Sequence, residues 1–195
     1  SQRRGFGLSP SVDGSLAICP TLSGYLVAYD LNRRQLAWSK SYPLNQSLMP
    51  GAAFNIVGGM DLRETDPMIS RPIDTAAIVH DGVTVFAPSN GVGVYGISNA
   101  DGSELWQVSH EEGSMFRYIA GIWNQLVVLV YAQEIVGLDL RTGQPAWSTI
   151  SMPSGAHVVG KCVRSDSKLL VPLSNQNLLE IDLLQGSISS ETRCE

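Results

Sequence analysis

Residues 134–147 of the chain read Glu-Ile-Val-Gly-Leu-Asp-Leu-Arg-Thr-Gly-Gln-Pro-Ala-Trp, and this stretch decides the fold. Apolar and other residues alternate from Ile135 to Leu140, as they do along a β-strand. Asp139 can accept hydrogen bonds from the backbone ahead of it, and Gly143 can adopt a positive φ. A short return strand would then carry Trp147. The stretch therefore predicts a β-hairpin.

Three more stretches, residues 25–38, 93–106 and 177–190, align with this one without a gap. In the shared pattern a small residue is followed two positions later by Asp, four positions later by Gly, and four positions later again by Trp. The motif residues are Ala28, Asp30 and Trp38; Gly96, Gly102 and Trp106; Gly137, Asp139, Gly143 and Trp147; and Asp182 and Gly186. The copies depart from the pattern at Arg34, Ser98, Glu180 and Ser190.

The spacing of the copies predicts a β-propeller. Successive positions of the Asp or Ser are 68, 41 and 43 residues apart, and a blade of four strands takes about 40–45 residues. The first interval is one blade plus an insertion. No stretch shows the 3.6-residue apolar period of a helix. We expect an all-β segment over residues 1–195 with about four four-stranded antiparallel blades, at about 5–42, 75–112, 115–152 and 156–194, and an insertion at 43–74.

The third blade shows the predicted strands best. Residues 118–123 and 126–131 form two strands around a turn at Asn124 and Gln125, and the strands of Ile135 and Trp147 follow.

The repeated pattern resembles the tryptophan-docking motif of the quinoprotein-like (PQQ-type) β-propeller family of bacteria. The resemblance covers residues 14–192 and is best in the third copy. It implies that Trp38, Trp106 and Trp147 stack between neighbouring blades. Because Ser190 stands where the fourth tryptophan would be, we expect the fourth blade to dock more loosely or to end the array.

Four blades are fewer than the seven or eight usual for such proteins. The chain is a fragment of a longer propeller, a ring closed by four blades, or one of two copies that complete a ring. The blade's wedge angle favours a fragment. Open blade edges also favour self-association.

Composition excludes some classes of partner. The net charge of −5 and the absence of a basic patch disfavour nucleic acid. The longest apolar stretch, residues 126–132, is far shorter than the ~20 residues of a membrane span, and the N-terminus lacks the layout of a signal peptide. We expect a soluble chain. A periplasmic or cell-surface location follows from the resemblance alone.

No set of residues predicts catalysis or a metal site. His110, Glu111 and Glu112 are adjacent, so their side chains point in different directions, and we expect a solvated loop. His80 adjoins a turn and His157 is isolated. Cys19 and Cys162 lie in apolar, strand-like stretches that favour buried thiols, and Cys194 could be free.

Other short motifs favour turns over chemistry. Ser89-Asn90 and Ser174-Asn175 occupy matching positions between strands, Ser154-Gly155 lacks the setting of a hydrolase elbow, and Gly91-Val-Gly93 is too short for a dinucleotide loop. The insertion at 43–74 is a lid, a partner contact or an inter-blade loop that packs on the blade edge and has no function of its own.

These features predict a non-catalytic propeller scaffold that binds a protein or a ligand in an exported bacterial protein, with no cofactor. The alternative is part of a dehydrogenase dependent on pyrroloquinoline quinone (PQQ) and calcium, whose other blades lie outside this chain. By resemblance, that enzyme would need two adjacent cysteines, a tryptophan floor and Glu, Asn and Asp around calcium, and this sequence has no adjacent cysteines. A third possibility is a purely structural assembly unit.

Overall fold

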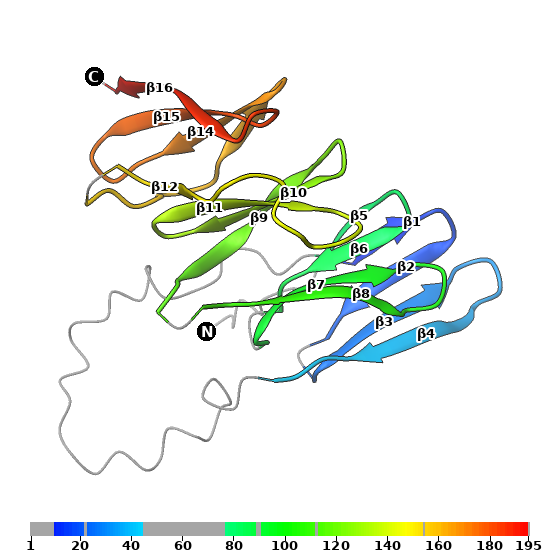
Figure 1. Ribbon diagram of the computed structural model, residues 1–195. Helices are drawn as coiled ribbons and strands as arrows, with labels where there is room; N and C mark the ends of the chain where they lie inside the picture. The colour runs from blue at the N-terminus through cyan, green and yellow to red at the C-terminus, as the bar shows by residue number, and fades with distance from the viewer. Residues whose placement is uncertain are drawn as a thin grey trace, which may run out of the picture. The chain divides into compact units, whose positions relative to one another are not determined.

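The computed structural model describes residues 10–21, 23–44, 77–88, 91–111, 113–153 and 155–194 (Figure 1). All regular structure in these ranges is β-strand, as sixteen strands in four sheets. The chain divides into two compact units, residues 1–109 and 110–195, each of which holds two sheets. The predicted all-β class with four four-stranded antiparallel sheets is confirmed.

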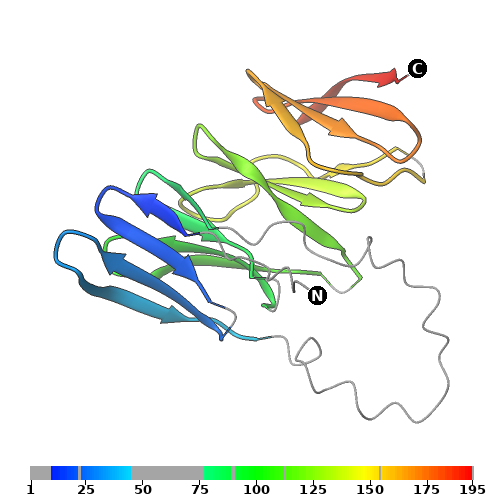
Figure 2. The same ribbon diagram turned by 180° about the vertical axis from the view of Figure 1, so that it is seen from behind.

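The first unit contains two antiparallel meanders, whose strands neighbour one another in chain order (Figure 2). The first comprises β1 (Ser11–Asp13), β2 (Leu16–Pro20), β3 (Tyr25–Asp30) and β4 (Gln35–Ser41). The second comprises β5 (Ile78–His80), β6 (Val83–Phe86), β7 (Gly93–Ser98) and β8 (Glu104–Ser109).

The second unit repeats this plan. Its first sheet comprises β9 (Phe116–Trp123), β10 (Leu126–Tyr131), β11 (Glu134–Asp139) and β12 (Ile150–Ser151). Its second sheet comprises β13 (Val163–Ser165), β14 (Lys168–Pro172), β15 (Asn177–Asp182) and β16 (Ser187–Arg193).

Two-residue turns with positive φ join the inner strands. Asn124 and Gln125 have φ angles of 43° and 68° between β9 and β10, and Asp81 and Gly82 have φ angles of 49° and 74° between β5 and β6. Two such residues are typical of the turn whose twist matches that of the strands it joins. The turn predicted at residues 124–125 is present.

One predicted strand is wrong. Trp147 lies in a bend, and β12 begins only at Ile150. Pro145 has no N–H to donate, so residues 138 and 145 form only an isolated bridge, although the N–H of Ala146 still donates to Gly137 O at 2.8 Å. The return segment of the hairpin is therefore held to β11 only by this bridge and this hydrogen bond before the short strand β12 begins.

A hydrophobic core lies between the two sheets of each unit. In the first unit the core joins Ile18, Leu26 and Ala28 to Phe86 and Ile97. In the second unit a larger core joins side chains such as Val128 and Ile135 to Leu179 and Ile181. Alternate side chains of β10 and of β14, such as Val128 and Val130 or Leu169 and Val171, reach this core, as the period of two requires.

The predicted insertion at 43–74 lies outside the described residues except for Pro43 and Leu44. Leu44 forms an isolated antiparallel bridge with Gly91. The described residues contain no helix with the length and hydropathy that crossing a membrane requires.

Candidate functional site

The turn of each repeat is organised by one carboxylate. Asp30, Asp139 and Asp182 each accept, through Oδ1, hydrogen bonds from the N–H groups two and three residues ahead, at 2.8–3.1 Å. In the second copy, where Ser98 replaces the aspartate, Asp101 Oδ1 instead accepts from the N–H and Oγ of Ser103. Hydrogen bonds from Ser103 lower the pKa of Asp101, and those from Thr142 and the backbone lower the pKa of Asp139.

The glycine of each turn adopts the left-handed conformation. Gly102, Gly143 and Gly186 have φ angles of 73°, 67° and 62°, and each donates its N–H to the carbonyl oxygen four residues earlier. Arg34 takes the same place in the first copy with a φ of 55°. Glycine adopts this conformation without the steric cost that a Cβ adds. The first turn thus keeps its shape despite the substitution.

The small residue of the motif lies against the tryptophan ring of its own sheet. Ala28 is the cross-strand partner of Trp38. A Cβ at Gly96 would lie 2.2 Å from Cε2 of Trp106, and one at Gly137 would lie 2.2 Å from Cε2 of Trp147. Nothing larger than glycine fits under these two rings.

In each unit, the turn glycine of the second sheet lies against the tryptophan ring of the first sheet. A Cβ at Gly102 would lie 2.7 Å from Cδ2 of Trp38, and one at Gly186 would lie 2.1 Å from Cγ of Trp147. The structure therefore brings Ala28, Trp38 and Gly102 together in one unit, and Gly137, Trp147 and Gly186 together in the other. That these contacts hold the sheets together stays a prediction, with its test in the Discussion.

The fourth copy has no tryptophan, and a charged residue that forms an ion pair takes the place of its small residue. Glu180 takes the place of the small residue, and its Oε1 lies 2.5 Å from Lys168 Nζ and 2.8 Å from Ser189 Oγ. The hydrogen bond from Lys168 lowers the pKa of Glu180. Ser190 lies opposite Glu180 in β16.

Asn99 is a buried polar residue that the sequence analysis missed. Its side chain accepts from Thr84 Oγ1 and donates to Asp13 Oδ2, both at 2.6 Å, and its carbonyl accepts from Trp38 Nε1 at 2.9 Å. It stands where the other copies have leucine. That exception was the available signal, because a buried amide requires partners.

His110 is less solvated than predicted. Its ring stacks on Phe116 at 4.8 Å and meets the edge of Tyr131, whose hydroxyl lies 3.4 Å from Nδ1. Burial lowers the pKa of His110 and raises that of Tyr131 to about 12. Phe116 begins β9 directly after the loop and covers the ring.

The described ranges hold no cluster of three or more His, Cys, Asp or Glu side chains that could bind a metal ion. Glu111 is exposed, and Glu112 lies outside these ranges.

Cys162 precedes β13 and so does not lie in a strand, contrary to the prediction. Tyr118 Oη accepts from Cys162 N at 2.7 Å, lies 3.2 Å from its Sγ and donates to Gly160 O at 3.1 Å. These contacts fix an irregular segment. Burial raises the pKa of the Cys162 thiol to about 11. Cys19 in β2 is half-buried, and Cys194 is exposed.

Two of the predicted turn motifs can be compared with the structure. Ser174 and Asn175 lie in a turn, where Ser174 Oγ accepts from the N–H of His157 at 3.1 Å. Gly93 instead begins β7, because its missing Cβ lets β8 approach: a Cβ there would lie 2.3 Å from Val108 O. Residues 89, 90 and 154 lie outside the described ranges.

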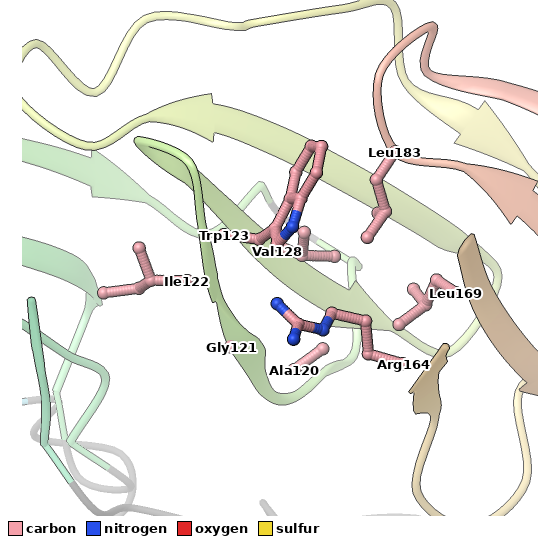
Figure 3. A pocket seen from close by; sticks show the side chains of 8 residues that line it. All are labelled: Ala120, Gly121, Ile122, Trp123, Val128, Arg164, Leu169 and Leu183. Carbon is pink, nitrogen blue, oxygen red and sulfur yellow. The ribbon is translucent and has the colours of Figure 1, made fainter. Parts of the chain in front are cut away.

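A small apolar pocket lies between β9 and the sheet of β13–β16 (Figure 3). It encloses about 260 Å³ of space open to solvent and is lined by Ala120, Gly121, Ile122, Trp123, Val128, Arg164, Leu169 and Leu183. Arg164 extends over the pocket beside Trp123 and supplies its one charged group (Figure 3). A bulge at residues 128–129 distorts the pairing of β9 with β10 beside this wall. The apolar walls can accommodate one apolar side chain of a ligand, and the Arg164 guanidinium can bind a carboxylate next to it.

The described residues do not fit the quinone site that the resemblance implies for a dehydrogenase. The Cys162 thiol is held by Tyr118, and no cysteine is adjacent to another anywhere in the sequence. No reaction step through that cofactor follows from these residues.

Comparison with solved structures shows the propeller fold. BamB from Moraxella catarrhalis has a TM-score of 0.63 at 18% identity, with 94% of this chain and 48% of that chain covered. A europium-containing methanol dehydrogenase has a TM-score of 0.63 at 11% identity, covering 95% and 41%. Quinohemoprotein alcohol dehydrogenase from Comamonas testosteroni has a TM-score of 0.63 at 12% identity, covering 97% and 35%. The chain thus spans less than half the length of each.

A search of curated proteins gives no match. A family model described as outer membrane protein assembly factor BamB matches residues 3–193, nearly the whole chain. The predicted likeness to PQQ-type propellers is confirmed. The chain belongs to the family of the outer membrane protein assembly factor BamB.

Proposed function

We propose that this chain is a non-catalytic propeller scaffold that binds a protein partner during the assembly of outer membrane proteins. The observation that carries the proposal is the family match over residues 3–193, together with four sheets of one repeated design. Assembly at the outer membrane implies an exported bacterial protein that works in the periplasm.

The pocket between β9 and the β13–β16 sheet supports binding of a peptide segment. Its walls are apolar, and Arg164 forms no ion pair or hydrogen bond within the described part of the chain. An apolar side chain of the partner would enter beside Trp123, and an acidic neighbour would pair with Arg164. A bidentate carboxylate is the partner that a guanidinium favours.

The test replaces the natural gene with one encoding Arg164→Glu in the complete protein. We expect less folded β-barrel protein in the outer membrane, measured as the fraction of barrels whose gel mobility changes on heating. Arg193→Glu, which reverses an exposed charge away from the pocket, is the control and should leave that fraction unchanged. Deletion of the gene should have the largest effect.

Normal barrel assembly after gene deletion would overturn the proposed role. Normal assembly with Arg164→Glu alone would remove only the pocket from the proposal. Turnover of an alcohol or aldose by the purified protein, with added PQQ and calcium, would favour the dehydrogenase alternative instead.

A further inference from the structure

The third sheet departs from the other three at one position of its first strand. In the pairing of β9 with β10, Gly121 lies opposite Val128. The same position by register holds Ser11, Ile78 and Val163 in the first, second and fourth sheets. A Cβ at Gly121 would meet no atom of the described chain within 4 Å. The third sheet therefore has open space where the other sheets have a side chain.

A bulge in β9 adds to this space. The pairing shifts by one residue between Val128 and Leu129, which leaves Ala120 as the extra residue. Ala120 and Gly121 are thus two small residues in succession, and both line the pocket between β9 and the β13–β16 sheet. Leu169 of the β13–β16 sheet lines it as well (Figure 3). A ligand in the pocket would contact apolar atoms of both sheets.

The β13–β14 hairpin places a guanidinium at this space. Arg164 pairs with Leu169 in the hairpin, and paired residues of antiparallel strands point to the same face of the sheet. Because Leu169 belongs to the core, the side chain of Arg164 lies on the core side, where it extends over the pocket beside Trp123 (Figure 3). Within the described ranges Arg164 has no ion pair or hydrogen bond. Its charge is thus available to a ligand.

The position of the guanidinium limits where the carboxylate of a peptide ligand can come from. In an extended peptide the next side chain points to the opposite face, and the one after it lies about 7 Å farther along. An acidic side chain at either place would have to fold back over the pocket and would lose rotamer freedom. A C-terminal residue carries its side chain and its carboxylate on the same Cα. It therefore presents both groups to the pocket at once.

The strands that border the pocket favour a polypeptide over a small apolar acid. Both β9 and β13 are edge strands, and each pairs with one other strand in the described part of the chain. An edge strand offers backbone N–H and C=O groups to an extended segment. The residues that precede a chain terminus can use these groups, whereas a free amino acid has no such residues.

We propose that this pocket binds the C-terminal residue of a partner polypeptide, with a large apolar side chain in the space beside Gly121 and the terminal carboxylate paired with the Arg164 guanidinium. The inference rests on the peptide-binding role proposed above and specifies the source of its carboxylate. A guanidinium suits this group because its planar fork can donate two hydrogen bonds to one carboxylate.

The experiment measures binding of peptides to the complete protein by fluorescence anisotropy. The probe is a hexapeptide with a fluorescent label at its N-terminus, five polar uncharged residues and a C-terminal phenylalanine with a free carboxylate. Amidation of that carboxylate should weaken binding by roughly ten- to a hundredfold, the range for a hydrogen bond to a charged group. Serine in place of the phenylalanine should weaken binding by roughly tenfold or more, because the buried apolar area is lost.

A change in the protein separates the two parts of the ligand. Arg164→Gln should remove the difference between the acid and the amide but keep the preference for phenylalanine over serine. Arg193→Gln, at an exposed position away from the pocket, is the matched control and should keep both differences. Because Arg164 is exposed, its replacement should leave the far-ultraviolet circular dichroism spectrum unchanged.

Three results would overturn the inference. The first is failure of the acid peptide to bind, or equal binding of the acid and the amide. The second is an amidated peptide with aspartate after the phenylalanine that binds as tightly as the acid, which would assign the carboxylate to a side chain. The third is equally tight binding of N-acetylphenylalanine, measured by competition, which would favour a small apolar acid. The proposed function has a separate readout, barrel assembly after gene deletion, so the two failures are distinguishable.

Discussion

At the scale of single residues, the missing Cβ of Gly186 leaves room for the Trp147 ring between two sheets. A Cβ at Gly186 would lie 2.1 Å from Cγ of Trp147, closer than any stable contact allows, and its φ of 62° disfavours any side chain. The same positive φ occurs at Gly155 with open space around it, so conformation and steric clash can be separated.

Replacing Gly186 by Ala should lower the free energy of unfolding of the second unit by about 2–5 kcal/mol, the sum of left-handed strain and overpacking. Gly155→Ala carries only the strain, about 1–2 kcal/mol. Urea unfolding, monitored by far-ultraviolet circular dichroism, measures both. Equal losses in the two variants would mean that the contact with the indole ring is relaxed at little cost.

The Cys162 thiol gives a second test at this scale. Its pKa of about 11 means that very little thiolate is present at pH 8, whereas Cys194 is exposed. We expect iodoacetamide to modify Cys194 quickly and Cys162 slowly, as followed by mass spectrometry of peptides. Tyr118→Phe removes the hydroxyl that holds the segment, so Cys162 should then react faster while Cys194 does not change. Equal rates in the parent chain would contradict the burial of Cys162.

At the scale of elements, the loop between β8 and β9 is held by aromatic packing. His110 precedes β9, and its imidazole stacks on Phe116, which in turn contacts Tyr131. Burial among these aromatic side chains disfavours the protonated imidazole. Burial depresses its pKa in the folded state below the ordinary value of 6.5. The unfolded chain therefore binds a proton first as the pH falls, and that binding favours unfolding.

Stability should consequently be constant for this group above pH 6.5 and should decline as the pH falls below that value toward the depressed pKa. His110→Phe keeps the stacked ring and removes the titration, so its unfolding free energy should decline less between pH 6.5 and 5. Urea titrations at several pH values measure the difference. His157→Phe is the control, and identical pH profiles for His110→Phe and the parent chain would refute the assignment.

At the scale of the whole molecule, each of the two compact units has its own core and its own tryptophan between sheets. Trp38 is 8% exposed, and its Nε1 donates to Asn99 O. Trp147 packs against the core of the second unit, and its buried Nε1 has no hydrogen-bond partner among the described residues. Each ring lies between the small residue of its own sheet, Ala28 or Gly137, and the turn glycine of the next sheet, Gly102 or Gly186.

Trp38→Ala should raise hydrogen exchange in residues 11–41 and 78–109 and leave residues 116–193 protected, because a lost core tryptophan costs about 3–5 kcal/mol within its own unit. Trp147→Ala should give the reverse. Hydrogen–deuterium exchange read by mass spectrometry tests both variants. Loss of protection throughout the chain with either variant would show that the units unfold as one.

The sequence by itself determined the sheet architecture of this protein. The alternation of apolar residues, the Asp and Gly of each turn and the 41- and 43-residue spacings are local patterns, and local patterns fix strands and hairpins. They predicted four four-stranded sheets and the turn at Asn124 and Gln125. They failed at Trp147, where one proline interrupts the predicted strand. They also failed at Gly93, which was predicted to lie in a turn but begins β7, where its missing Cβ lets β8 approach.

Only the tertiary structure decided how residues far apart in the chain meet. Asn99 holds Thr84, Asp13 and the Trp38 ring together, Tyr118 holds Cys162, and Arg164 covers an apolar pocket formed by two sheets. The burial of such side chains depends on packing between strands of different sheets, which periodicity along one strand does not encode. The fold was therefore predictable from local pattern, whereas the candidate sites required the packed chain.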